Sequence, residues 1–238
     1  MPKIAFIIPF FNEERNLKYL IEEWENFFLK NKLEIKNFKF FFVDNGSKDQ
    51  SKKVIKSTAK KIRFKILNFK ENSHGLSCKF GYLRIIKLKK NFNYILQIDS
   101  DNQCDPKYFT KFIREIKKTR NVFVYGKRAS RKDGIIRSFF SSILRILVFF
   151  KTSINIEDIN TPYRLMKINE LDKVFKNIKK KYGNKKIGLF NSLLTYETMK
   201  KSKITWINIT FRDRKFGKTK HGSLRMLMLL FNLILNLK

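Results

Sequence analysis

The chain has 238 residues, enough for one large domain or two small ones with a sizeable core. Hydrophobic residues make up 43% of it and 25 residues are Phe, so the composition excludes an intrinsically disordered protein. The formal net charge of +33 favours a polyanionic partner, such as nucleic acid, an anionic membrane surface or a phosphorylated substrate, although solvated lysines spread along the chain would give the same total.

The two cysteines, Cys78 and Cys104, do not have the spacing of a metal site and predict no disulfide framework, which favours a reducing cytoplasm. The N-terminus runs directly into a strand pattern, so we expect no signal peptide. We also find no apolar stretch of the length needed to span a bilayer.

Strand and helix patterns alternate through the first half of the chain. Strands are predicted at 3–9, 38–43, 62–69, 94–98 and 122–126, and helices begin near Asn12 (as N-cap), Asp49, Gly75 and Pro106. Repeated strand–helix units predict an α/β protein with a doubly wound, mostly parallel sheet flanked by helices. The strand ends would gather polar residues at one edge, where a nucleotide is the natural ligand. No glycine-rich dinucleotide or Walker motif is present, so ordinary dehydrogenase and NTPase functions are disfavoured.

The strand at 94–98 ends in a group of oxygen-bearing side chains. Asp99 and Asp101 are two residues apart and Gln103 follows, a set that suits Mg²⁺ or Mn²⁺ together with water and substrate phosphates. The alternative is a turn followed by a helix, with Asp105 as N-cap. His74, in the loop before Gly75, is a catalytic candidate, although a lone loop histidine is more often a surface residue.

The second half of the chain changes in character. Residues 135–150 predict an apolar helix that is buried or lies in a membrane interface, and 157–166 bring carboxylates near Arg164. Residues 173–186 are expected to form an exposed lysine-rich connection, followed by a helix at 187–199 carrying Glu197 and a strand at 203–211.

A basic loop and then an apolar helix are predicted at the C-terminal end of the sequence. The loop at 212–222 could cover a diphosphate or be a solvated linker. The apolar helix at 224–237 would reach only about 20 Å. It would therefore lie on a membrane, pack on a partner or cover the sheet.

Seven short motifs occur in the order typical of one family. They are Ile-Pro-x-x-Asn-Glu at 8–13, Val-Asp-Asn-Gly-Ser-x-Asp at 43–49, a Gly-Leu helix start at Gly75, Asp-x-Asp-x-Gln at 99–103, Gly-x-Arg at 126–128, Asp-x-Asn-Thr-Pro-Tyr-Arg at 158–164, and Arg-x-x-Gly-x-Thr-Lys at 214–220. The chain resembles a family 2 glycosyltransferase (a hexosyltransferase) of the GT-A fold over residues 3–222, and among these it is most similar to the dolichol- or polyprenyl-phosphate sugar synthases. The domains expected are a GT-A domain at 1–222 and a short apolar helix at 223–238.

The resemblance implies roles for particular residues. Nucleotide-sugar binding is expected from Pro9, Glu13, Asp44, Gly75, Asp99, Ser100 and Arg128; the divalent metal from Asp99, Asp101 and Gln103; acceptor phosphate binding from Arg137 and Arg164; and catalysis from Asp101, Arg214, Lys220, Asp158 and Glu197. Asn45 departs from the frequent Asp-Asp-Gly-Ser motif, which leaves the nucleobase open.

The expected chemistry is a single displacement at the anomeric carbon with inversion. A polyprenyl phosphate acceptor is already ionised, whereas a hydroxyl of a glycan or glycolipid would need a base, with Asp158 or Glu197 as candidates. We expect the first case, at the cytoplasmic face of an anionic membrane. A nucleic-acid-binding protein is the rival from another class, and it is disfavoured because most aromatic residues fall in predicted strands and helix stripes.

Overall fold

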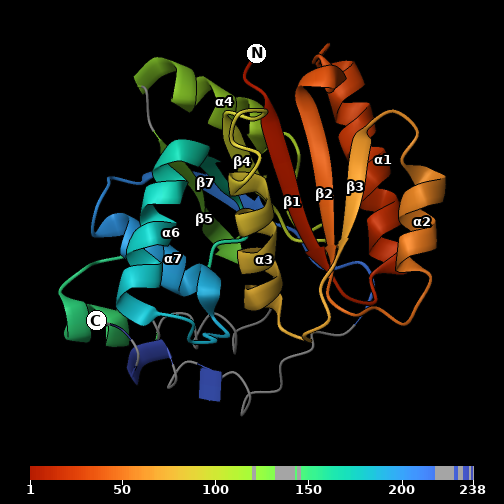
Figure 1. The fold of residues 1–238 in the computed structure, drawn as a ribbon. Helices are drawn as coiled ribbons and strands as arrows, with labels where there is room; N and C mark the ends of the chain where they lie inside the picture. The colour runs from red at the N-terminus through yellow and green to blue at the C-terminus, as the bar shows by residue number, and fades with distance from the viewer. Residues whose placement is uncertain are drawn as a thin grey trace.

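The computed structural model describes residues 1–119, 122–131, 143, 146–217, 228–229, 233–235 and 237. Within these, one sheet of seven strands has the order β3-β2-β1-β4-β6-β5-β7 (Figure 1). The strands are β1 (Ile4–Phe10), β2 (Phe38–Asp44), β3 (Arg63–Asn68), β4 (Tyr94–Gln97), β5 (Phe123–Arg131), β6 (Arg164–Lys167) and β7 (Thr205–Phe211). All pairings are parallel except those of β6, which runs antiparallel to both β4 and β5. The mostly parallel α/β sheet predicted from the sequence is confirmed.

Helices cover both faces of the sheet. Helices α1 (Glu14–Lys30), α2 (Ser51–Thr58) and α4 (Tyr108–Thr119) pack on one face, and α3 (His74–Ile86), α6 (Ile168–Tyr182) and α7 (Phe190–Met199) pack on the other. A short 3₁₀ turn, η1 (Ile35–Asn37), leads into β2. Two separate hydrophobic clusters result, one on each side of the sheet.

The central strands are buried on both faces, which explains their continuous apolar sequences. Every residue of β1 is buried, and its side chains alternate between the two clusters. Phe6 stacks on Phe40 of β2 with ring centroids 4.2 Å apart, and Trp24 of α1 meets Phe6 edge-on at 5.0 Å. Trp24 and Phe28 of α1 are therefore core residues on one side of the sheet.

Three local predictions were wrong. Asn12 does not cap α1, which begins at Glu14; it has φ 51° and its Oδ1 accepts a hydrogen bond from the backbone N–H of Lys48 in the loop after β2. The segment expected as an exposed connection at 173–186 is largely the amphipathic helix α6, whose Val174 and Phe175 are buried. Strand β6 was not predicted at all, because four residues give too short a pattern to recognise.

The apolar segments of the second half are only partly described. Residues 146–152 are helical, and so are 228–229 and 233–235. Leu233 and Leu237 are buried in the cluster with α6 and α7, while Met228 and Leu235 are exposed. Part of the C-terminal segment thus covers the core. Among the described residues, no helix combines the length and apolar character that a membrane crossing requires.

Candidate active site

Three adjacent strands bring their following loops to one edge of the sheet. β1 lies between β2 and β4, so the residues after each strand are neighbours. Backbone hydrogen bonds tie these loops together: Asn45 N–H donates to the Phe10 carbonyl at 2.9 Å, and Ile98 N–H to the Ile7 carbonyl at 3.1 Å. This is the edge at which open α/β sheets bind ligands.

Asp44 ends β2 and is almost fully buried. One carboxylate oxygen accepts the Ser47 N–H at 2.8 Å, and the other lies 2.8 Å from the Lys52 ammonium. Gly46 has φ +84°, a conformation that the turn between them requires and that glycine adopts without strain. The turn therefore holds Asp44 rigidly at the strand end.

Glu13, after β1, is joined to a loop about 200 residues away in the sequence. Arg214 donates to Glu13 Oε1 and, at 2.6 Å, to the carbonyl of Phe216. Asn16 donates to Glu13 Oε2 at 2.6 Å and to the same Phe216 carbonyl at 3.0 Å. The basic loop after β7 thus lies against the start of α1, close to the strand ends.

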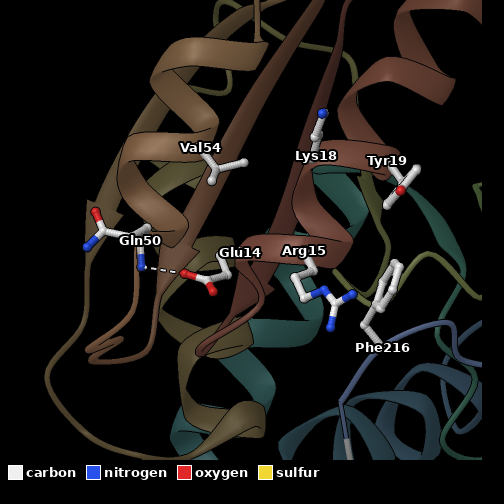
Figure 2. Close-up of a pocket in the computed structure, with 7 residues that line it drawn as sticks. All are labelled: Glu14, Arg15, Lys18, Tyr19, Gln50, Val54 and Phe216. Atoms are coloured by element: carbon white, nitrogen blue, oxygen red, sulfur yellow. Dashed lines mark hydrogen bonds between the residues drawn. The ribbon is translucent and has the colours of Figure 1, made fainter.

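The side chain of Phe216 anchors this loop. The Arg15 guanidinium lies 4.0 Å from its ring centroid, and the Tyr19 ring stacks on it with centroids 5.5 Å apart (Figure 2). A shallow pocket of about 370 Å³ lies beside it, between α1 and α2. The pocket is lined by Glu14, Arg15, Lys18, Tyr19, Gln50, Val54 and Phe216, and so does not include the carboxylates that follow β4.

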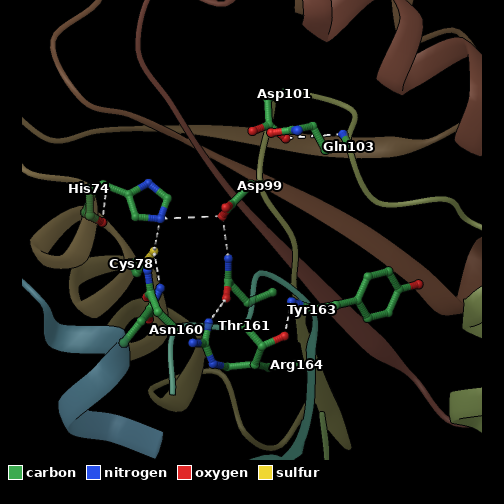
Figure 3. A network of polar contacts seen from close by, with 12 residues as sticks. His74, Cys78, Asp99, Asp101, Gln103, Asn160, Thr161, Tyr163 and Arg164 are labelled. Carbon is green, nitrogen blue, oxygen red and sulfur yellow. Dashed lines mark hydrogen bonds and ion pairs between the residues drawn. The ribbon is translucent and has the colours of Figure 1, made fainter. Parts of the chain in front are cut away.

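Asp99 and Asp101 follow β4, with the buried Ser100 between them. Asp99 Oδ1 accepts a hydrogen bond from Gln97 Nε2 at 2.9 Å and lies 3.4 Å from His74 Nε2, and Asp101 Oδ1 accepts the Gln103 N–H at 3.2 Å (Figure 3). Burial and the Asp99 charge raise the pKa of Asp101 to about 7, against the opposing effect of the Gln103 N–H and the Arg214 charge.

Two neighbouring carboxylates at the sheet edge fit a hard divalent cation, whose charge would offset their burial and mutual repulsion. The described residues contain no group of three or more His, Cys, Asp or Glu side chains arranged to hold a metal. The pair would therefore need further oxygen ligands, and donor phosphates or water would supply them.

Gln103 was expected to contact the metal. Its side chain is buried and Nε2 donates to the Arg212 carbonyl at 2.7 Å, while Arg212 N–H donates to the Gln103 carbonyl at 2.9 Å. Gln103 thus fastens the loop after β7 to the loop after β4, and a metal contact would have to come from its Oε1.

Pro9 and Gly75 have structural explanations besides the predicted nucleotide contact. Pro9 lies beyond the last β1–β4 pair, Ile7 with Gln97, where its missing N–H costs no ladder bond. A Cβ on Gly75 would lie 2.1 Å from the carbonyl oxygen of Gly188, so only glycine fits this close approach of α3 to the segment before α7. Nucleotide contact by either residue stays a prediction.

Arg128 and Asp158 form a tight pair. Arg128 Nε and Nη2 each donate to Asp158 at 2.7 Å, and Nη2 also donates to the Asn160 carbonyl at 3.1 Å. Both side chains are largely buried. Contact of Arg128 with donor phosphates, or proton abstraction by Asp158, would therefore require this pair to open.

Glu197 has a structural explanation in the fold, and its role as a catalytic base stays a prediction. Its carboxylate is fully buried on α7 and faces α6, where it accepts hydrogen bonds from Lys181 at 2.9 Å, Asn177 at 2.8 Å and Tyr182 at 2.8 Å. These partners use both oxygens to join two helices. The helix predicted around Glu197 is present. The sequence alone could not show that the Glu197 side chain points toward α6.

Arg164 also has a structural explanation, and its contact with an acceptor phosphate stays a prediction. The residue begins β6 and its side chain is fully buried, with Nη1 donating to Gln97 Oε1 at 2.5 Å. Arg137 and Lys220 lie outside the described residues. His74, which the sequence reading favoured as a surface residue, and Gln97, which it did not single out, both contact Asp99. The position of Gln97 two residues before Asp99 was the available signal.

Comparison with known proteins decides the family. The sequence profile of "Glycosyl transferase family 2" matches residues 5–175. The chain belongs to this family. The family 2 glycosyltransferase is 29% identical, over 68% of its length, to 70% of an uncharacterized protein of Methanocaldococcus jannaschii. It is 21% identical, over 98% of its length, to 67% of the undecaprenyl-phosphate 4-deoxy-4-formamido-L-arabinose transferase of Photorhabdus laumondii. It is 25% identical, over 73% of its length, to 56% of a dolichyl-phosphate beta-glucosyltransferase of Trichomonas vaginalis.

Solved structures agree on the fold. Glucosyl-3-phosphoglycerate synthase of Mycobacterium tuberculosis, solved with Mn²⁺, UDP-glucose and phosphoglyceric acid, superposes with TM-score 0.65 at 11% identity, covering 99% of this chain and 79% of that one. S. aureus TarS with UDP-GlcNAc gives TM-score 0.62 at 16% identity, covering 98% and 65%. The glycosyltransferase therefore has the GT-A fold that its motifs imply.

Proposed function

We propose that this glycosyltransferase moves a sugar from a nucleotide-sugar to a polyprenyl phosphate, using Mg²⁺ or Mn²⁺ held by Asp99 and Asp101. The observation that carries the proposal is the carboxylate pair at the end of β4, where Asp101 lies within electrostatic reach of the Glu13–Arg214 pair. The polyprenyl- and dolichyl-phosphate transferases among the relatives support the acceptor class.

The chain's own residues have distinct tasks in this reaction. Glu13 and Asp44 would hold the nucleoside, since both are fixed at strand ends. The divalent cation would neutralise the donor diphosphate and the charge that develops on the leaving group. Arg214, held by Glu13 and the Phe216 carbonyl, would add positive charge at the same place.

The state of the candidate bases favours a phosphate acceptor over a hydroxyl. Asp158 is bound to Arg128 through both oxygens, and Glu197 is buried between helices. An acceptor that is already ionised needs no base and avoids this difficulty. A hydroxyl acceptor is the alternative, and it would require Asp158 to be released from Arg128.

The decisive experiment is a transfer assay on purified protein with UDP-, GDP- and dTDP-sugars, with and without Mn²⁺ and a short polyprenyl phosphate. Product that requires both the metal and the lipid phosphate is expected. Metal-dependent donor binding without lipid transfer would redirect the search to hydroxyl acceptors. Absence of donor binding under every condition would refute the proposal.

We also propose peripheral contact with the cytoplasmic face of a membrane. Six exposed apolar side chains come from two segments that the contact of Lys151 Nζ with the Ile234 carbonyl joins. They are Ile146, Leu147, Phe149, Phe150, Met228 and Leu235. Exposed apolar side chains of this kind, on a chain with net charge +33, suit an anionic bilayer.

A liposome sedimentation assay tests the membrane contact. Phe150, at 79% the most exposed of the six, is replaced by Ser together with Phe149. Reduced sedimentation with anionic liposomes is expected. Leu29→Ser on α1, 48% exposed, is the matched control and should bind as the unmodified protein does. Equal binding of the two variants would refute a membrane contact through Phe149 and Phe150.

A further inference from the structure

Arg164 is a buried cation without a carboxylate partner among the described residues. Its side chain has no exposed surface, and its Nε and Nη2 have no hydrogen-bond partner there. The Tyr125 ring centroid lies 5.6 Å from its Cζ, and Nη1 donates to Gln97 Oε1 at 2.5 Å. Burying a guanidinium in this way is costly, so a packing role alone explains it poorly.

The contact with Gln97 fixes the orientation of the Gln97 amide. A guanidinium only donates hydrogen bonds, so the atom facing Arg164 must be the oxygen, Oε1. Nε2 of the same amide then faces the catalytic edge, where it donates to Asp99 Oδ1 at 2.9 Å. If the amide were reversed, its oxygen would face the Asp99 carboxylate and repel it.

Asp99 is consequently held through one oxygen. Oδ1 receives Gln97 Nε2 and has His74 Nε2 at 3.4 Å, whereas no described residue donates a hydrogen bond to Oδ2 (Figure 3). The carboxylate is thus oriented through Oδ1 by Gln97 and His74. Its second oxygen is left for a ligand.

We propose that Arg164 and Gln97 act together as positioning residues that orient Asp99 so that Oδ2 serves the divalent cation of the donor diphosphate. This inference rests on the proposed function, which assigns the cation to Asp99 and Asp101. Partners that orient ligating side chains commonly alter metal affinity by about 10- to 100-fold when they are removed. Arg164 acts only through Gln97, so the two residues form one unit.

The test measures Mn²⁺ affinity without catalysis. Free Mn²⁺ is followed by electron paramagnetic resonance in the presence of UDP, GDP or dTDP, for the unmodified protein and for Arg164→Met, Gln97→Met and the double variant. Each single variant should bind Mn²⁺ about 10- to 100-fold more weakly. The double variant should be no weaker than Gln97→Met, because Arg164 has nothing left to orient.

Urea unfolding of the same variants separates positioning from stability. Gln97→Met leaves a buried guanidinium without its acceptor and should be the least stable. The double variant should regain stability, because the buried charge is gone, while its Mn²⁺ affinity stays low. Glu25→Gln is the control. The buried Glu25 carboxylate accepts hydrogen bonds from the backbone N–H groups of Lys60, Lys61 and Ile62. These residues precede β3, so they lie at the ends of the strands opposite to the Asp99 site. It should bind Mn²⁺ normally.

Different failures have different meanings. Normal Mn²⁺ affinity in Arg164→Met would overturn the inference and leave the cation site intact. A further loss from Gln97→Met to the double variant would also overturn it, and this comparison remains valid if Arg164→Met alone does not fold. If the unmodified protein binds no Mn²⁺ with any nucleotide, the cation site of the proposed function fails, and the inference fails with it.

Discussion

Replacing Gly75 by Ala distinguishes two explanations of the same residue. The family motif assigns Gly75 to the nucleotide, whereas the structure places it against the backbone of Gly188. If nucleotide contact were its only constraint, Gly75→Ala should stabilise the protein, because Ala is the better helix former by about 1 kcal/mol. The structure predicts the opposite sign.

The size of the effect follows from the atoms that a Cβ would meet. It would lie 2.1 Å from Gly188 O and 2.8 Å from Phe190 N, both backbone atoms that cannot rotate away. Separating α3 from this segment by more than an ångström should cost about 3 kcal/mol, the upper part of the range for overpacked cores. Gly188→Ala is the matched control from the same contact. Among the described residues, its Cβ would meet only the Leu229 side chain, with Cδ2 at 2.5 Å and Cγ at 3.9 Å. That side chain can turn aside, so we expect about 1 kcal/mol.

Urea denaturation monitored by tryptophan fluorescence measures both variants, and nucleotide-sugar binding is measured alongside. We expect Gly75→Ala to be clearly less stable than Gly188→Ala and to bind donor weakly, because α3 carries His74 to Asp99. A Gly75→Ala protein as stable as the unmodified one but unable to bind donor would refute the packing argument and restore the nucleotide assignment.

Three further substitutions test other parts of the structure. Asp101→Asn should reduce transfer by at least about 100-fold without loss of stability in urea, because it removes a half-buried charge that repels Asp99; normal activity would exclude Asp101 as a metal ligand. Glu25→Ala should cost about 3 kcal/mol in urea unfolding, because three backbone N–H groups lose their acceptor, and a stability unchanged from the unmodified protein would contradict this. Glu197→Gln should lower stability by about 1 to 3 kcal/mol, because Lys181 loses its charged partner, while the transfer rate stays the same. Lost transfer in a protein of normal stability would instead support Glu197 as a base.

The sequence predicts the parallel half of this fold well for a physical reason. Strands buried on both faces must be apolar throughout, so β1, β2 and β4 stand out, and the polar residues after them must lie at one edge. The direction of a side chain on a helix or loop is decided instead by tertiary contacts. Arg128 and Glu197 have the right residue types for catalysis, yet their charges are used against Asp158 and Lys181 in the fold. Neither pairing has a local sequence signal.

Strand β6, the one antiparallel strand in the described part of the sheet, explains why Arg164 lies beside the end of β4. In a parallel pair, the residue beside the end of β4 would be the last one of its neighbour. Because β6 runs the other way, its first residue, Arg164, pairs with the last residue of β4, Gln97. The motif around 158–164, which precedes and begins β6, is thereby brought to the carboxylates that follow β4. Arg164, 65 positions after Asp99 in the sequence, is thus connected to it through the single amide of Gln97.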